Sequence, residues 1–125
     1  MIGVDLVKID RIKRLMERFG DKALTKFLCQ DEIALAKSIN TVAGFWASKG
    51  AISKALGLGI SKRCSFFDIK IFKDKKNRPY FKLSKHLIQE FDITELDLSI
   101  THEDGLAIAV AYIKSKKIRQ IELIF

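Results

Sequence analysis

The side chains best suited to chemistry lie in the stretch 41–60, TVAGFWASKGAISKALGLGI. Lys49 and Ser53 are four residues apart, so a helix would make them neighbours on its surface, with Lys54 beside them. An ammonium and a hydroxyl group on one strip provide hydrogen bonds that suit a phosphate. The same spacing also fits an ordinary solvated helix face, so this pattern leaves two interpretations open.

Two isolated polar residues are further candidates. Asp5 interrupts the apolar run MIGVDLV at residues 1–7, where a charged side chain is costly unless it has a partner. It either caps the helix that follows or binds a metal ion. His102 lies beside a predicted hairpin, a place where histidine is more often a surface residue than a catalytic one.

The element that must position the lysines is one long helix over 41–60, because its apolar residues keep a near-helical spacing. Asn40 or Thr41 is expected to cap its start, and Gly57 and Gly59 provide the positive φ that ends a helix. The apolar positions are Val42, Phe45, Trp46, Ile52, Ala55 and Leu56.

The rest of the chain predicts alternating short helices and strands. Helices are expected over 9–19, 21–27, 31–37 and 85–91, and strands over 1–7, 64–72, from 79, 96–101, 106–113 and 118–125. The Asp104-Gly105 pair between the strands 96–101 and 106–113 is a strong hairpin signal. The pattern predicts an α+β fold in which a long central helix packs on a small antiparallel sheet.

Size and charge narrow the class of protein. The 125 residues predict a single domain over 1–125. The net charge of +8 favours a polyanionic partner: a nucleic acid, an anionic membrane or an acidic protein. The two cysteines lack metal-ligand spacing, and no apolar run is long enough to span a bilayer, so we expect a cytoplasmic protein that binds no membrane. The helix 9–19 carries a dense basic face.

Three ordered motifs carry a family resemblance. GVDLVKIDRI (3–12), FWASKGAISKALGLGI (45–60) and LSITHEDGLAIA (98–109) resemble the holo-acyl-carrier-protein synthase family of 4'-phosphopantetheinyl transferases. FLCQDE (27–32) and SFFDIKIFKDKKNRPY (65–80) are similar to the segments between them, so the resemblance covers nearly the whole chain. It implies a 4'-phosphopantetheinyl transferase-like fold, and a homotrimer with sites between subunits. The implied reaction is Mg²⁺-dependent transfer of the 4'-phosphopantetheine group of coenzyme A to a serine of acidic apo-acyl carrier protein, in fatty acid biosynthesis.

The resemblance also implies a metal site, and here the sequence departs from the family pattern. Asp5 matches one Mg²⁺ ligand, but the second position, a glutamate in the family, is Gly50 in this chain. A water molecule could fill that position, because Mg²⁺ tolerates a largely aqueous shell. Alternatively, Glu32 or Glu103 could reach the ion, or the chain is an impaired homologue that still binds coenzyme A.

Other site residues follow from the resemblance. Asp5 and His102 match catalytic positions, His102 as a phosphate contact rather than a general base. The positions matched to coenzyme A binding are Lys49, Ser53, Lys54, Gly57, Arg78, Pro79, Thr101 and His102. On the basic helix, Arg11, Arg14 and Arg18 are expected to dock the carrier protein. A basic nucleic-acid-binding module is the rival interpretation from another class, although we expect no nucleic acid partner.

Overall fold

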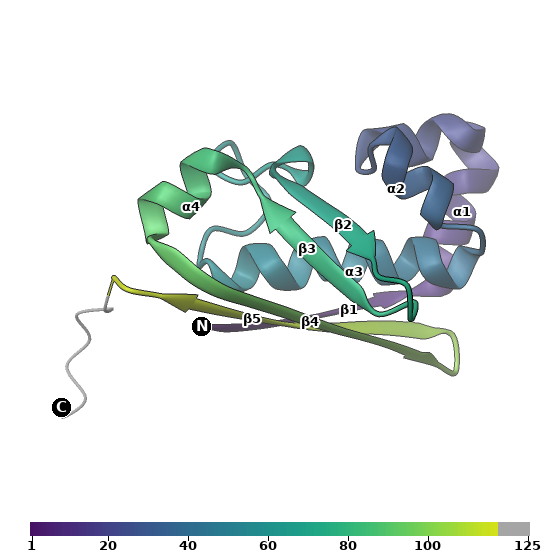
Figure 1. Ribbon diagram of the computed structural model, residues 1–125. Helices are drawn as coiled ribbons and strands as arrows, with labels where there is room; N and C mark the ends of the chain where they lie inside the picture. Colours follow the sequence, from purple (N-terminus) through teal and green to yellow (C-terminus); the bar gives the residue numbers. More distant parts are fainter. Residues whose placement is uncertain (118–125) are drawn as a thin grey trace, which may run out of the picture.

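The computed structural model describes residues 1–117. Its first half is largely helical, and its second half consists of two hairpins separated by a helix (Figure 1). The elements, in chain order, are β1 Ile2–Lys8, α1 Ile9–Phe19, the 3₁₀ helix η1 Gly20–Lys26, α2 Gln30–Leu35, α3 Ile39–Ala55, the 3₁₀ helix η2 Phe66–Asp68, β2 Ile69–Lys73, β3 Pro79–Leu83, α4 Lys85–Phe91, β4 Ile93–Glu103 and β5 Leu106–Ser115.

The helix α3 packs on a three-stranded antiparallel sheet with the strand order β1-β5-β4. Three alanines of the central strand, Ala107, Ala109 and Ala111, are fully buried on the inner face, so the helix can lie close to the sheet. Gly3 allows the closest approach, because a Cβ atom there would lie 2.6 Å from the backbone nitrogen of Ala55. The predicted α+β fold, with a long central helix on a small antiparallel sheet, is confirmed.

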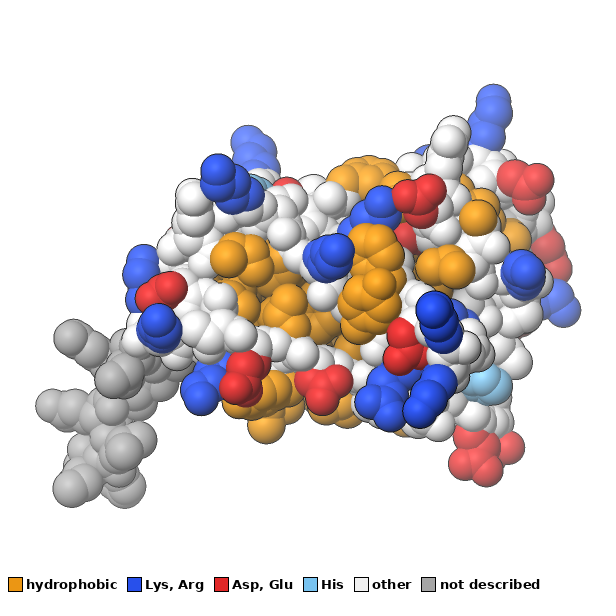
Figure 2. Space-filling view, viewed as in Figure 1, with side chains coloured by type: hydrophobic (Ala, Val, Ile, Leu, Met, Phe, Trp, Pro, Cys, Tyr) orange, Lys and Arg blue, Asp and Glu red, His pale blue; other side chains and the backbone are white. Residues whose placement is uncertain are grey.

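The strands β4 and β5 form a hairpin whose turn is Asp104-Gly105. Both turn residues have positive φ, 50° and 74°, which matches the twist of a two-residue hairpin. The second sheet is the two-stranded ribbon β2–β3, and α1, η1 and α2 gather at one end of α3 (Figure 1). Figure 2 shows lysine and arginine side chains spread around this face of the molecule and hydrophobic side chains near its centre.

The bounds of α3 differ from the expected ones. The helix begins at Ile39, and its N-cap is Ser38 rather than Asn40 or Thr41, since the Ser38 hydroxyl accepts a hydrogen bond from the Thr41 N–H at 3.2 Å. The helix ends at Ala55. Gly57 and Gly59, with φ of 75° and 62°, belong to the loop beyond it.

Three strands also differ from their expected bounds. The first strand, β1, runs from Ile2 to Lys8 rather than over 1–7, and Asp5 lies in its middle. The strand expected over 64–72 begins only at Ile69, because the Ser65 side chain caps the short helix η2. Pairing with β5 extends β4 from Ile93 to Glu103, so His102 lies within a strand. The strand expected over 118–125 lies outside the described residues.

Candidate functional site

A first pocket, the β1 pocket, lies between β1, α3 and the loop that follows α3. Its lining residues are Asp5, Trp46, Gly50, Ser53, Lys54, Gly59, Ile60 and Phe66. Asp5 points from the inner face of β1 towards α3, where Lys54 Nζ donates a hydrogen bond to Asp5 Oδ1 at 2.8 Å. The structure therefore brings together four residues that the sequence analysis singled out, namely Asp5, Gly50, Ser53 and Lys54.

Gly50 determines where the Asp5 carboxylate lies. A Cβ atom on Gly50 would overlap Asp5 Oδ2 and lie 2.8 Å from Asp5 Cγ. Any side chain at position 50 would force the carboxylate to move, so the carboxylate occupies space that only glycine leaves free. The Ser53 hydroxyl donates to the Gly50 carbonyl oxygen at 2.8 Å, within α3.

Aromatic side chains form one wall of the β1 pocket, and the sequence analysis did not assign them to the site. Phe66 and Trp46 have ring centroids 5.3 Å apart, and Phe27 packs edge-on against Trp46 at 4.8 Å. The Arg11 guanidinium lies 5.7 Å from the centre of the Trp46 ring. The helical spacing of the apolar residues over 41–60 accounts for Trp46 as a core residue. No separate signal in the sequence indicated that it lines a pocket.

Lys49 is not part of a surface strip, which corrects the sequence-based placement. It is fully buried, and Nζ donates at 2.8 Å to Glu32 Oε1 and to the carbonyl oxygens of Phe27 and Phe66. Burial lowers the pKa of Lys49, and the hydrogen bond and charge of Glu32 oppose that shift. Because all three donors have partners, Lys49 has none left for a phosphate and serves as a structural cation.

A second pocket, the β4 pocket, lies on the opposite side of α3. Its lining residues are Asn40, Thr41, Gly44, Phe45, Lys73, Asn77, Pro79, Ile100 and His102. His102 and Pro79, both predicted to bind coenzyme A, meet here. The sequence analysis did not single out Gly44 for this site; a Cβ atom there would lie 2.9 Å from the Ile100 side chain.

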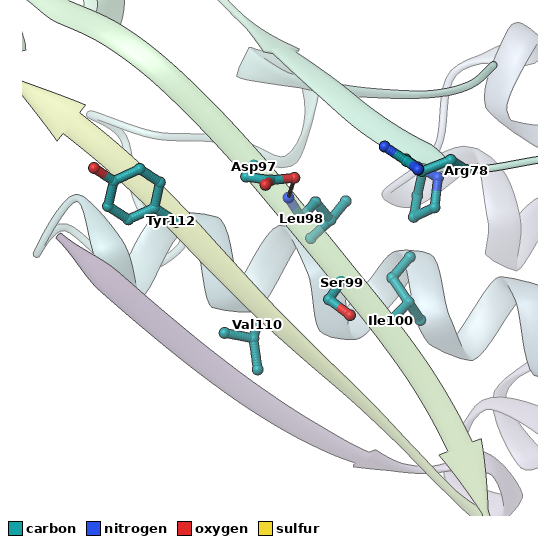
Figure 3. Close-up of a pocket in the computed structure, with 8 residues that line it drawn as sticks. Arg78, Asp97, Leu98, Ser99, Ile100, Val110 and Tyr112 are labelled. Atoms are coloured by element: carbon teal, nitrogen blue, oxygen red, sulfur yellow. Dashed lines mark hydrogen bonds between the residues drawn. The ribbon is translucent and has the colours of Figure 1, made fainter.

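Arg78 lines a neighbouring hollow at the β4 edge of the sheet, beside Pro79 (Figure 3). In Figure 3, Arg78 lies beside β4, on the side away from β5, while Val110 and Tyr112 extend from β5. Asp97 accepts a hydrogen bond from the Leu98 N–H at 2.8 Å. Two other predicted coenzyme A contacts lie elsewhere: Thr101 is exposed and lines neither pocket, and Gly57 lies in the loop after α3.

One chain does not bring the two pockets together. Asp5 of β1 and Ile100 of β4 both pair with Ala109 of β5, on opposite sides of that strand, so β5 lies between them. The helix α3 packs over β5 and turns Gly50 and Lys54 towards β1 but Gly44 towards β4. The predicted catalytic residues Asp5 and His102 therefore lie in different pockets, with the central helix between them.

The predicted docking arginines share the exposed face of α1. A shallow groove there is lined by Lys8, Asp10, Arg11, Arg14, Leu15, Arg18 and Phe19. Arg14 pairs with Asp10 at 2.8 Å, which neutralises part of its charge. The Arg18 guanidinium carbon lies 5.1 Å from the centre of the Phe19 ring, which is a cation–π contact.

The residues of the β1 pocket do not fit the two-carboxylate magnesium site that the resemblance implies. Among residues 1–117, Asp5 is the one acidic side chain in the lining of this pocket, and it is paired with the Lys54 ammonium. Glu32 cannot supply the second carboxylate because it is buried against Lys49. Glu103 pairs with Leu106 at the hairpin end of β4, roughly 14 Å from Asp5 by strand spacing. Across residues 1–117, no group of three His, Cys, Asp or Glu side chains could hold a metal ion.

No helix among residues 1–117 is long and apolar enough to cross a membrane. The Lys54 ammonium and His102 are groups that can bind an anionic ligand, and the Asp5 carboxylate can accept a proton. The Ser53 hydroxyl is buried, and its one hydrogen is already donated to the Gly50 carbonyl oxygen. Each of the two pockets therefore offers a group suited to a phosphate-bearing ligand, Lys54 in the β1 pocket and His102 in the β4 pocket.

Comparison with known proteins identifies the family. The chain is 55% identical over 113 residues to the holo-[acyl-carrier-protein] synthase of Campylobacter curvus, covering 90% of this chain and 99% of that protein. It is 49% identical over 121 residues to the Sulfurimonas denitrificans synthase, covering 97% of this chain and 100% of that protein. The crystal structure of the Helicobacter pylori synthase in complex with coenzyme A superposes with a TM-score of 0.88 at 47% identity, covering 91% of this chain and 100% of that one.

The family model of the 4'-phosphopantetheinyl transferase superfamily matches residues 1–111. This range contains all three motifs that carry the resemblance, both pockets and the arginines of α1. The chain belongs to the 4'-phosphopantetheinyl transferase superfamily.

Proposed function

We propose that this chain is a holo-[acyl-carrier-protein] synthase, which transfers the 4'-phosphopantetheine group of coenzyme A to a serine of apo-acyl carrier protein. The observation that carries the proposal is its likeness, in sequence and in fold, to a synthase crystallised with coenzyme A. The implied setting is fatty acid biosynthesis in the cytoplasm. We assign Mg²⁺ no two-carboxylate site in this chain, because the residues present do not provide one.

The reaction places defined demands on the pockets. The serine oxygen forms a bond to the phosphorus that carries pantetheine, and the bond from that phosphorus to the bridging oxygen breaks, releasing adenosine 3',5'-bisphosphate. Such a transfer depends on positioning and on neutralising the charge of the phosphates. Lys54 is the exposed cation of the β1 pocket, and the Asp5 carboxylate is the proposed acceptor of the serine proton.

The nucleotide end belongs in the β4 pocket and the hollow beside it. Pro79, Asn77 and His102 line the pocket, and Arg78 lines the hollow. These groups offer a ring surface, an amide, an imidazole and a guanidinium, which can contact a base, a ribose and a phosphate. Since α3 separates this pocket from Asp5 and Lys54, one ligand that contacts both must be bound by two chains.

A homotrimer supplies this arrangement, and the outer face of the sheet supports it. Ile2, Val4 and Leu6 of β1 are exposed by 73%, 55% and 53%, and Val110 and Tyr112 of β5 lie beside them. Contiguous apolar side chains on a protein surface indicate an interface. Packing these faces together would bring the β1 pocket of one subunit near the β4 pocket of the next.

The face of α1 is the proposed docking site for the carrier. Arg11 lies over Trp46, a wall of the β1 pocket, so an acidic protein bound along α1 would place its serine near Asp5. Charge complementarity of this kind raises the association rate and orients the partner.

The proposal is tested by mass spectrometry of apo-acyl carrier protein after incubation with this chain, coenzyme A and Mg²⁺. We expect the carrier to gain the mass of one phosphopantetheine group, and a carrier with its acceptor serine replaced by alanine to gain none. Binding of coenzyme A without any adduct would contradict the proposal and favour the impaired homologue suggested by Gly50. Salt-sensitive nucleic acid binding without coenzyme A binding would favour the rival module.

A further inference from the structure

We propose that the Lys54 ammonium, held by Asp5 beside Gly50, is the resident cation that neutralises the diphosphate of coenzyme A. It follows that coenzyme A binds to this chain without a divalent metal ion. The inference rests on the proposed function, because it takes coenzyme A as the ligand of the β1 pocket. It goes beyond that function because it assigns to the Lys54 side chain the positive charge that the family resemblance assigns to Mg²⁺.

The first support is the space that Gly50 leaves. Because a Cβ atom on Gly50 would overlap the Asp5 carboxylate, the carboxylate can adopt its position only with glycine there. From that position Oδ1 accepts the Lys54 hydrogen bond at 2.8 Å. The Asp5–Lys54 ion pair therefore depends on glycine at position 50, because only glycine leaves room for the Asp5 carboxylate beside the Lys54 ammonium.

The second support is the exposure of the two partners. The Asp5 side chain is 20% exposed and the Lys54 side chain 57% exposed. The carboxylate is thus held at the base of the pocket while the ammonium faces its opening. An ammonium has three N–H donors, and among the described residues Asp5 accepts only one of them. Two donors remain to bind phosphate oxygens.

The third support is the charge of the lining. Asp5 and Lys54 are the only two charged side chains that line the β1 pocket among residues 1–117. The other lysine of this part of α3, Lys49, points away and is fully committed to Glu32 and two carbonyl groups. A diphosphate that enters the pocket therefore meets one accessible cation among its lining residues within 1–117, and a hydrogen bond between two charged groups is stronger than one between neutral groups.

The test measures the affinity for coenzyme A by isothermal titration calorimetry, once in EDTA and once in Mg²⁺. For the unmodified chain we expect the two affinities to agree within about threefold. Lys54→Gln should lower the affinity in EDTA by about tenfold or more, the equivalent of 1.4 kcal/mol. Lys70→Gln is the matched control, since Lys70 forms an exposed ion pair with Asp31 at 2.7 Å and lines neither pocket. The affinity of this variant for coenzyme A should not change.

Gly50→Glu provides the opposite test. The new side chain must displace the Asp5 carboxylate and adds a negative charge beside the diphosphate, so coenzyme A should bind at least tenfold more weakly in EDTA. Mg²⁺ binds one or two carboxylates together with phosphates, so it should restore the affinity of Gly50→Glu and raise the rate of metal-dependent transfer.

The outcomes separate the inference from the proposed function. If the unmodified chain binds coenzyme A only in Mg²⁺, or if Lys54→Gln binds as well as the unmodified chain in EDTA, the inference is wrong while the function stands. If the chain binds no coenzyme A under either condition, the proposed function itself is wrong.

Discussion

At the scale of single residues, Lys49 and Lys54 have separate tasks although they are close in the sequence. Lys49 ties three segments together, since its ammonium binds the carbonyl oxygens of Phe27 and Phe66 as well as Glu32. Glu32 in turn accepts the N–H groups of Cys29 and Ile71. Every partner in this buried network is satisfied, which is the condition under which a buried ion pair is tolerated.

Replacing Lys49 should therefore affect folding. Lys49→Met leaves the Glu32 carboxylate buried without its cation, and we expect the free energy of unfolding to fall by about 3–5 kcal/mol. Urea denaturation measures this. Lys70→Met, which removes a lysine from an exposed ion pair, should leave the free energy of unfolding nearly unchanged. Equal effects of the two substitutions would contradict the structural role of Lys49.

The sequence indicated that Asp5, Gly50 and Lys54 belong to one site, but it did not show that Lys49 points into the core. Five residues along a helix is a rotation of about 140°, so Lys49 and Lys54 cannot share a strip. The spacing of four between Gly50 and Lys54 places both beside Asp5. Which lysine faces the core depends on Glu32, a contact between segments that are far apart in the chain.

At the scale of elements, α1 carries the basic face that is the proposed docking site for acyl carrier protein. Its bounds, Ile9–Phe19, agree with the helical pattern of its apolar residues. The basic groove that it carries lies beside the β1 pocket through the contact of Arg11 with Trp46. Docking and chemistry are thus adjacent but use different side chains.

Reversing charge on α1 should separate the two substrates. Arg11→Glu with Arg18→Glu should raise the apparent KM for acyl carrier protein at least tenfold, because an acidic partner is then repelled, and the effect should weaken with added salt. The Kd for coenzyme A should stay the same. Steady-state kinetics and calorimetry give the two values.

The control for this prediction is Lys82→Glu with Lys85→Glu, which changes the net charge equally on residues outside the groove of α1. It should leave the KM for the carrier nearly unchanged. An equal loss of carrier and coenzyme A affinity in the α1 variant would contradict the docking assignment.

Element types could be predicted from the sequence more accurately than element ends. The hairpin turn follows from Asp104-Gly105, whose positive φ angles suit these residues. The glycines Gly57 and Gly59 were expected to end α3, but the helix ends before them, at Ala55. Positive φ suits a glycine in a loop as well as in a helix cap, so the sequence did not distinguish the two. The strand β4 proved longer because pairing with β5 stabilises residues that show no strand pattern of their own.

At the scale of the whole molecule, the outer face of the sheet and the separation of the pockets point to the same assembly. In a single chain the apolar side chains of β1 at Ile2, Val4 and Leu6 contact solvent. The run MIGVDLV predicts a buried strand, but one chain buries only its inner face. A sequence shows that a strand is apolar on both faces and does not show whether a second copy covers one of them.

A charge on this outer face should separate the subunits. Leu6→Lys should shift the mass measured by light scattering from three chains to one, and transfer activity should fall with it, because each site would lose half of its residues. Tyr80→Lys is the control, since Tyr80 is exposed by 42% on the β2–β3 ribbon. A single-chain mass for the unmodified protein would contradict the proposed trimer.

A crystal structure of this chain with coenzyme A tests the central claim most directly. The claim is that the two pockets on either side of α3 hold one ligand between neighbouring subunits. We expect the diphosphate within hydrogen-bond distance of Lys54 Nζ of one subunit, and the nucleotide against Pro79 and His102 of the next. A coenzyme A molecule that contacts neither pocket, or that one chain binds alone, would contradict the account.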